Sequence, residues 1–269
     1  MKSIAIILCL MIIPFLGQTQ VDSVFQFERE SGSQVVDFSV DALGNVYILG
    51  KNDQLKKLDA KGDSVAVFNA TKRYGQLYSI DVTNPLKILL YYKDYGTVVT
   101  LDRFLSIRST LDLRSQNIFQ AKAGGLAYDN NIWVFDELDG KLKRIGEDGK
   151  LIMQTNDLRL VFDTLPSPEF IADQDGLVYL YDITRGVYLF DYYGALKTHI
   201  PFTGWRDFMI LEKTIYGRKN NEMMKYQPGS LDLKEIKIPP MFQSATRIRV
   251  TQQKLYVLDK GVLKVYSMK

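Results

Sequence analysis

His199 is the only histidine among the 269 residues, so it is the first candidate for acid–base chemistry. A hydrolase that combines serine, histidine and aspartate needs its imidazole beside a nucleophile in a pocket. The surrounding segment, Leu196-Lys197-Thr198-His199-Ile200, is typical of an outer β-strand. We therefore expect a partly exposed strand histidine without a catalytic role. A single histidine also excludes a metal site built from several histidines.

The segment Asp173-Gln174-Asp175-Gly176 is a second candidate, because alternate aspartates before a glycine could wrap a calcium ion. An EF-hand loop needs a glutamate nine residues after the second aspartate, where this sequence has Thr184. We interpret the segment as a turn in which aspartate caps the backbone and glycine takes a positive φ. The sequence also lacks a phosphate-binding loop and a dinucleotide fingerprint.

The elements that would position any site come from a unit of short strands that recurs six times. Each copy centres its second strand on an aromatic or large aliphatic residue, and these residues follow one another at intervals of 37 to 46: Tyr47, Leu89, Trp133, Tyr179, Tyr216 and Tyr256. One four-stranded propeller blade takes roughly 40–50 residues. The sequence therefore predicts an all-β, six-bladed β-propeller, with blades at about residues 35–70, 76–113, 120–158, 167–202, 205–239 and 244–268.

The last repeat ends after its third strand, so the sixth blade needs one more strand. Val24-Phe25-Gln26-Phe27 alternates in strand fashion ahead of the first repeat. If the segment 21–31 pairs with residues 262–266, it completes the last blade and closes the ring. Closure of this kind removes two exposed strand edges.

Two repeats carry the pattern of a known family. In blade four, Asp173 to Asp182 is followed by Val187-Tyr188-Leu189-Phe190-Asp191 and Gly194, and residues 41–62 follow nearly the same pattern. These segments resemble NHL-type propeller repeats. The resemblance extends over the blades as a whole and implies a scaffold, which hosts unrelated functions in different proteins.

Some related six-bladed propellers are lactonases or lyases that hold a metal in the central channel with carboxylates, Asn or His. The resemblance implies that such ligands would come from the ends of the innermost strands, where this chain has Asp37, Asp81, Asp129, Glu169 and Asp207. No two of them share a local ligand motif, and acidic residues there commonly cap turns. We predict no catalytic residue, no metal ligand and no cofactor.

Aromatic and arginine side chains gather at one end of the predicted ring. The connections between blades and the turns between second and third strands lie at the same end of the ring, which we call the loop-rich face. The remaining turns lie at the opposite end, which we call the turn face. The loop-rich face receives Tyr92, Tyr95, Arg185, Trp205 and Arg206. Such side chains often anchor interfaces. We predict that these five residues form a binding surface; the alternative is that they pack over the blade edges.

The N-terminus has the features of a secretory signal peptide at residues 1–19. Lys2 precedes an apolar run of 13 residues, and small residues flank a cleavage site after Thr19. The run is shorter than the roughly 20 residues that span a membrane. The only cysteine, Cys9, lies within this segment, so the mature chain at 20–269 has no thiol or disulfide.

Charge excludes one class of partner. A net charge of +3 without a long Lys/Arg run does not favour nucleic-acid binding. We expect a monomeric, exported protein, periplasmic or secreted, without a membrane-spanning segment in the mature chain. It would act as a non-catalytic binding or assembly module with a protein partner in the cell envelope. Two alternatives remain: a metal-dependent enzyme of the lactonase or lyase type, and a carbohydrate-binding module, which would need flat, exposed aromatic side chains.

Overall fold

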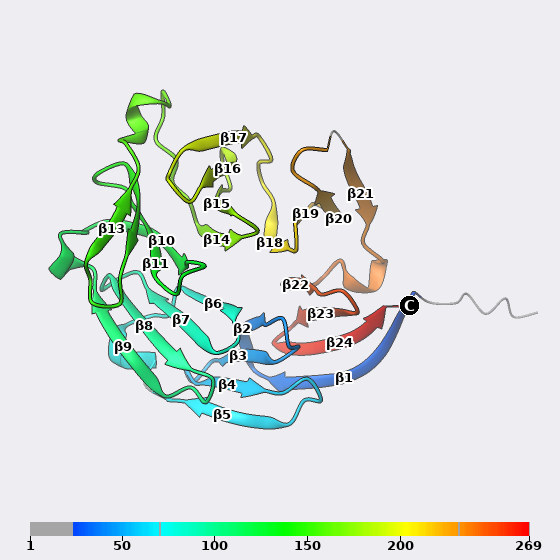
Figure 1. Cartoon of the computed structure of the whole chain (residues 1–269). Coiled ribbons are helices and arrows are strands. Elements are labelled where there is room, and N and C mark those ends of the chain that lie inside the picture. Colours follow the sequence, from blue (N-terminus) through cyan, green and yellow to red (C-terminus); the bar gives the residue numbers. More distant parts are fainter. Residues whose placement is uncertain (1–23, 70, 231, 269) are drawn as a thin grey trace, which may run out of the picture.

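The computed structural model describes residues 24–69, 71–230 and 232–268. Within these ranges the chain forms 24 strands in six four-stranded antiparallel sheets, which surround a central channel as blades (Figure 1). The all-β, six-bladed propeller predicted from the sequence is therefore confirmed. The predicted signal peptide at 1–19, with Cys9, lies outside the described residues.

In each blade the strands are ordered from the channel outward. Blade 1 contains β2 (Val35–Val40), β3 (Val46–Gly50), β4 (Leu55–Leu58) and β5 (Ser64–Phe68). Blade 2 contains β6 (Ser79–Asn84), β7 (Lys87–Tyr92), β8 (Thr97–Asp102) and β9 (Ile107–Asp112). Blade 3 contains β10 (Ala121–Leu126), β11 (Ile132–Asp136), β12 (Lys141–Ile145) and β13 (Leu151–Gln154).

The second half of the ring repeats this order. Blade 4 contains β14 (Phe170–Gln174), β15 (Leu177–Asp182), β16 (Gly186–Asp191) and β17 (Leu196–Ile200). Blade 5 contains β18 (Arg206–Leu211), β19 (Thr214–Lys219), β20 (Glu222–Tyr226) and β21 (Leu233–Lys237). Blade 6 contains β22 (Arg247–Val250), β23 (Lys254–Asp259), β24 (Val262–Met268) and β1 (Phe25–Ser33). The connections between blades carry short 3-10 turns: η1 (Thr71–Tyr74), η2 (Arg114–Gln116), η3 (Leu158–Leu160) and η4 (Pro240–Phe242).

Blade 6 closes the ring with strands from both ends of the chain. Strand β1 pairs antiparallel with β24, from Phe25 opposite Met268 to Ser33 opposite Val262. The ring of Phe25 also meets the ring of Phe242 edge-on at 5.3 Å, which anchors the N-terminal strand to the connection before β22. The predicted closure by the N-terminal segment is confirmed.

The regular spacing seen in the sequence reflects equivalent places in the blades. The six evenly spaced residues all lie in second strands: β3, β7, β11, β15, β19 and β23. Apart from Tyr216, which is half-buried, their side chains are buried. The hydrophobic core fills the spaces between neighbouring blades; Trp133 of blade 3, for example, packs in one cluster with Ile171 and Val178 of blade 4. Burial of such large side chains stabilises each blade junction.

Turns with aspartate and glycine end several strands. In the turn after β2, a carboxylate oxygen of Asp41 accepts the amides of Leu43 and Asn45, each at 2.9 Å. In the turn after β16, Asp191 accepts the amides of Tyr193 and Ala195. Glycine supplies the left-handed position of this second turn, where Gly194 has φ of 81°.

The turn at 173–176 differs in one respect. Gly176 has the expected positive φ, of 85°. The expected cap is wrong: the carboxylate of Asp173 accepts hydrogen bonds from Tyr128 and Trp133 of blade 3 and not from its own turn.

Candidate functional site

A backbone hydrogen bond that recurs in five blades holds the connections of the loop-rich face in place. In each case a residue after the outermost strand donates its amide to a carbonyl in the turn between the second and third strands. The pairs, at 2.7–2.9 Å, are Leu113 to Gly96, Leu158 to Gly140, Gly204 to Ile183, Ile238 to Asn221 and Val35 to Gly261. The connections of this face are therefore attached to the blades beneath them.

The five residues predicted to form a binding surface all lie at this end of the ring, but they differ in exposure. Tyr95 and Arg206 are exposed, and the side chain of Arg185 is 35 % exposed. Tyr92 is fully buried, and Trp205 is only 2 % exposed. The structure thus corrects the expectation for Tyr92 and Trp205, which pack in the core and do not reach the surface.

Packing between blades 4 and 5 accounts for the burial of Trp205. Its ring stacks on Phe202 at 4.5 Å and lies against the backbone of Gly217, where an added Cβ would be 2.6 Å from the indole. Its amide donates to the hydroxyl of Tyr181 at 2.7 Å. Trp205 therefore takes the packing role, the alternative left open by the sequence.

Ionic and polar contacts occupy much of Arg185. One guanidinium nitrogen lies 3.2 Å from a carboxylate oxygen of Asp182. The backbone carbonyl of Arg185 is 2.8 Å from Nε2 of His199. This histidine lies in β17, an outermost strand, as the sequence predicts. The imidazole also stacks on Tyr188 at 4.2 Å. His199 thus belongs to the packing of the outer part of blade 4, away from the channel.

Four exposed apolar side chains around blade 3 at the loop-rich face were not singled out from the sequence. We call them the blade 3 patch: Phe119, Leu138, Leu160 and Val161. Leu160 is 83 % exposed and Val161 58 % exposed. Both lie in residues 155–169, the longest connection between blades, which projects from the ring beside β13 (Figure 1).

Arg159 holds this projecting connection in place. Its guanidinium donates to the carbonyls of Leu138 and Asp139, at 3.3 and 3.0 Å, and pairs with the carboxylate of Asp157 at 2.8 Å. The amide of Glu137 donates to the carbonyl of Gln120, next to Phe119. The blade 3 patch therefore stands on backbone segments that are hydrogen-bonded to one another.

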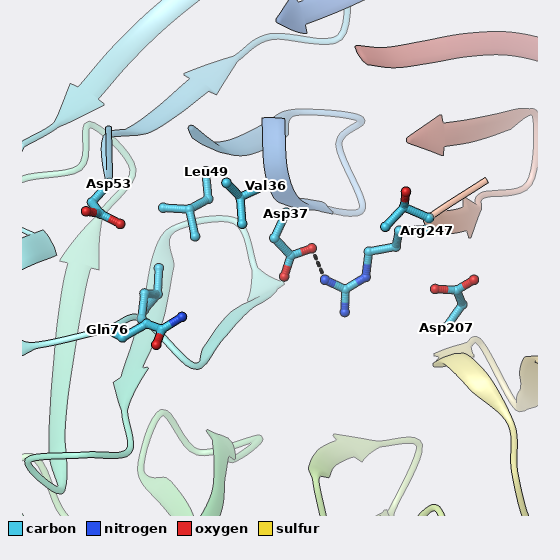
Figure 2. A pocket seen from close by; sticks show the side chains of 9 residues that line it. Val36, Asp37, Leu49, Asp53, Gln76, Asp207 and Arg247 are labelled. Carbon is cyan, nitrogen blue, oxygen red and sulfur yellow. Dashed lines mark ion pairs between the residues drawn. The ribbon is translucent and has the colours of Figure 1, made fainter. Parts of the chain in front are cut away.

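Two cavities lie along the channel. The larger, about 750 Å³, runs along the innermost strands and reaches the turn face at Leu43 and Gln253. The smaller, about 350 Å³, lies at the loop-rich end and is shown in Figure 2. There Asp37 points toward Arg247 and forms an ion pair with it, while Asp207 approaches from the other side.

Three of the acidic residues near the channel join neighbouring blades. Asp81 of β6 accepts the amide of Leu126 in β10 at 2.7 Å, and burial raises the pKa of its carboxyl. The ion pair of Asp37 with Arg247 joins blades 1 and 6. Asp207 of β18 pairs at 2.8 Å with Arg218 of the same blade, whose guanidinium donates to the carbonyl of Ala245 before blade 6.

The other two acidic residues are Asp129 and Glu169. Asp129 is on the β10–β11 turn, 3.5 Å from Arg144. Glu169 and Asp81 both line the larger cavity, whereas Asp37 and Asp207 line the smaller one. Among the described residues, no three His, Cys, Asp or Glu side chains gather closely enough to hold a metal ion. The five carboxylates therefore do not form a three-ligand channel site of the kind implied by lactonases and lyases.

No helix within residues 24–69, 71–230 and 232–268 has the length and hydrophobicity needed to cross a membrane.

Comparisons with known proteins identify the fold. No family model matches the chain, and no curated protein matches its sequence. Among solved structures, a streptogramin B lyase is similar with a TM-score of 0.59 and 15 % identity, over 88 % of this chain and 80 % of that one. A catalytically inactive virginiamycin B lyase from Staphylococcus aureus gives 0.60 and 12 %, over 88 % and 82 %. A chain of the mitotic checkpoint complex gives 0.56 and 11 %, over 87 % and 76 %. At such identities the similarity shows a shared β-propeller fold.

Proposed function

We propose that this chain is an exported, non-catalytic binding protein that contacts a protein partner in the cell envelope through its loop-rich face. The observation that carries the proposal is the blade 3 patch, where Leu160 and Val161 stand exposed on the longest connection. Exposed apolar groups that cluster on a soluble protein commonly mark interaction sites. Export rests on the sequence features of residues 1–19.

The way in which the patch is held favours binding. Arg159 and the amide of Leu158 attach the connection to the β11–β12 turn. A surface that is ordered before contact loses less conformational entropy on binding than a flexible loop does. Tyr95 and Arg206 add an exposed aromatic ring and an exposed guanidinium to the same face. Apolar anchors bordered by such groups are typical of protein interfaces.

We also propose that the repeats are of the NHL type. Support comes from the aspartate and glycine turns at 59–63 and 191–195, which join the third and fourth strands of blades 1 and 4. A similar turn at 41–45 joins the first and second strands of blade 1. Membership of that class concerns the scaffold. It leaves the choice of partner to the side chains of the loop-rich face.

The test compares two sets of charges on opposite faces. The double variant Leu160→Asp, Val161→Asp places carboxylates in the blade 3 patch; Leu86→Asp, at a leucine 59 % exposed on the turn face, is the matched control. Tagged full-length proteins are used to capture cross-linked partners from the native envelope, and each partner is then titrated. We expect the double variant to bind at least about tenfold more weakly, which corresponds to 1.4 kcal/mol.

Thermal melting separates binding from folding. Because Leu160, Val161 and Leu86 are all exposed, both variants should melt close to the wild-type temperature. If the double variant captures the same proteins with unchanged affinity, or if Leu86→Asp loses them equally, the loop-rich face is not the contact surface.

A further inference from the structure

The turn face carries a cluster of aromatic side chains that takes no part in the proposed protein interface on the loop-rich face. Tyr128 on the β10–β11 turn is 57 % exposed, and Tyr193 on the β16–β17 turn is 89 % exposed. The residue before Tyr193, Tyr192, stacks on Tyr128 with ring centroids 4.1 Å apart and an angle of 15° between the ring planes. The cluster therefore spans the junction of blades 3 and 4. We call Tyr128, Tyr192 and Tyr193 the tyrosine cluster.

Hydrogen bonds from both blades hold the tyrosine cluster in place. A carboxylate oxygen of Asp173 accepts the amide of Tyr128 at 3.0 Å and the indole N–H of Trp133 at 2.8 Å. The hydroxyl of Tyr192 accepts the amide of Gly176 at 3.0 Å. The amide of Tyr193 donates to Asp191. These rings are displayed on ordered turns, so a ligand would meet a preformed surface.

A guanidinium and a carboxylate lie beside Tyr128. The guanidinium of Arg144 lies 5.6 Å from the centre of the Tyr128 ring and 5.4 Å from that of Trp133. It is 3.5 Å from the carboxylate of Asp129, whose side chain is 27 % exposed. The Arg144 side chain is only 12 % exposed, and its Nε and Nη1 are buried, so it supports Tyr128 and Asp129 from below. The site thus combines aromatic rings with a partly exposed carboxylate that accepts hydrogen bonds.

We propose that the tyrosine cluster, with Asp129, binds a neutral saccharide. The faces of tyrosine rings carry partial negative charge and attract the C–H bonds of a sugar ring. A neighbouring sugar hydroxyl can donate to the carboxylate of Asp129, and hydrogen bonds to charged groups are stronger than neutral ones. The ligand class, the residues and the face all differ from those of the proposed protein interface.

Charge disfavours a polyanionic ligand at this site. Asp129 lies on the β10–β11 turn and Asp175 on the β14–β15 turn, and their carboxylates would repel a phosphate backbone. The β12–β13 turn of blade 3 exposes the charged side chains of Asp148 and Lys150, and it is followed by the exposed aliphatic side chains of Leu151 and Ile152. A protein partner is therefore one of the outcomes that the experiment must distinguish.

The proposal is tested by affinity electrophoresis and titration with defined probes: a soluble β-glucan, a mannan, a xylan and chitin oligosaccharides. The full-length mature protein should be retarded by, or bind, at least one of them. Tyr193→Ala and Asp129→Asn should each weaken that binding at least tenfold, whereas Tyr128→Phe, which keeps the ring, should retain it. The matched control is Tyr95→Ala, an exposed tyrosine on the loop-rich face, which should bind as the wild type does.

Other results would overturn the proposal. Tyr193 is 89 % exposed, so its variant should fold, and an unchanged melting temperature verifies this. Absence of binding to all four probes, or equal loss of binding with Tyr95→Ala, contradicts a saccharide site at the tyrosine cluster. Loss of a protein partner by Tyr193→Ala without any saccharide binding would assign the cluster to a protein interface instead. Loss of partner capture by the Leu160 and Val161 double variant, in contrast, concerns only the loop-rich face.

Discussion

The hydroxyl of Tyr181 lies between the backbone amide and the backbone carbonyl of Trp205, at 2.7 and 2.8 Å. It accepts a hydrogen bond from the amide and donates one to the carbonyl. Tyr91 reaches the carbonyl of Ala121 in the same manner, and Arg218 reaches that of Ala245. In blades 2, 4 and 5, a side chain of the second strand thus bonds to the entry of the next blade, which fixes the angle between blades.

Trp205→Ala should lower the free energy of unfolding by about 3–5 kcal/mol, because it opens a cavity among tightly packed aromatic rings. Urea unfolding at neutral pH measures this loss. Arg206→Ala is the neighbouring control, since that side chain is exposed and its removal should change stability by less than about 0.5 kcal/mol. Equal stability of both variants would show that Trp205 is not a core residue.

Gly217→Ala tests the same junction from the opposite strand. An added Cβ would lie 2.6 Å from the indole ring of Trp205, so the ring would have to move. We expect a loss of about 1–3 kcal/mol in urea unfolding. In the Trp205→Ala background the contacts with the indole are gone and only the Cβ of residue 205 remains, at 2.9 Å from the added Cβ. The same substitution should therefore cost less there, but still some stability. Additive losses in the double variant would contradict direct contact.

Much of the scaffold could be predicted because it follows from local patterns. The spacing of residues such as Tyr47 and Trp133 marks second strands, and turns such as Asp191 to Gly194 depend on the preferences of two residue types. Ring closure followed from counting strands in the last repeat. These features need no knowledge of contacts distant in the sequence.

Exposure could not be predicted in the same way. Trp205 and Tyr92 lie at the loop-rich end, as expected, but their burial depends on partners that the local sequence does not reveal, such as Gly217 beside Trp205. The sequence did contain an indication of the tyrosine cluster. Tyr192 and Tyr193 occupy the two turn positions that Ala60 and Lys61 fill in the equivalent turn of blade 1.

Deletion of β1 should destabilise the whole ring. A chain that begins at Gln34 leaves the edge of β24 unpaired and removes the contact between Phe25 and Phe242, which alone contributes about 2 kcal/mol. We expect a lower urea midpoint and aggregation through the exposed edge. Size-exclusion chromatography and urea unfolding are compared with a chain that begins at Val24. The closure would be unimportant if both chains unfolded at the same midpoint.

Export is tested by N-terminal sequencing of the protein recovered outside the cytoplasm. The small residues before Gln20 predict a mature chain that begins near that position. As a control, replacing Leu8 and Leu10 with Arg should interrupt the apolar run and keep the chain in the cytoplasm. A product that retains Lys2 and partitions into detergent would show an uncleaved anchor instead.

Asp182→Asn should make stability less sensitive to acid. Burial raises the pKa of Asp182, but hydrogen bonds from Thr184, Ser167 and Arg185 outweigh it and hold the pKa below its usual value. A carboxyl with a lowered pKa contributes stability above its unfolded-state pKa of about 4, and this stability is lost as the pH falls through the folded-state value. Wild type and variant should therefore differ most near pH 7 and converge in acid.

Asp81→Asn should change the pH dependence of stability in the opposite direction, so it serves as an internal comparison. Burial raises its pKa in the folded protein, so its charge opposes folding above that pKa and protonation removes the penalty as the pH falls. Relative to Asp81→Asn, the wild-type chain should thus gain stability as the pH falls from the raised folded-state pKa to the unfolded-state value of about 4. Relative to Asp182→Asn, it should lose stability below about 4, as the pH falls through the lowered folded-state pKa. Urea unfolding of the three proteins at pH 7, 5, 3.5 and 2.5 measures both trends. Curves that stay parallel for wild type and Asp182→Asn would show that the hydrogen bonds around Asp182 do not favour its charged form.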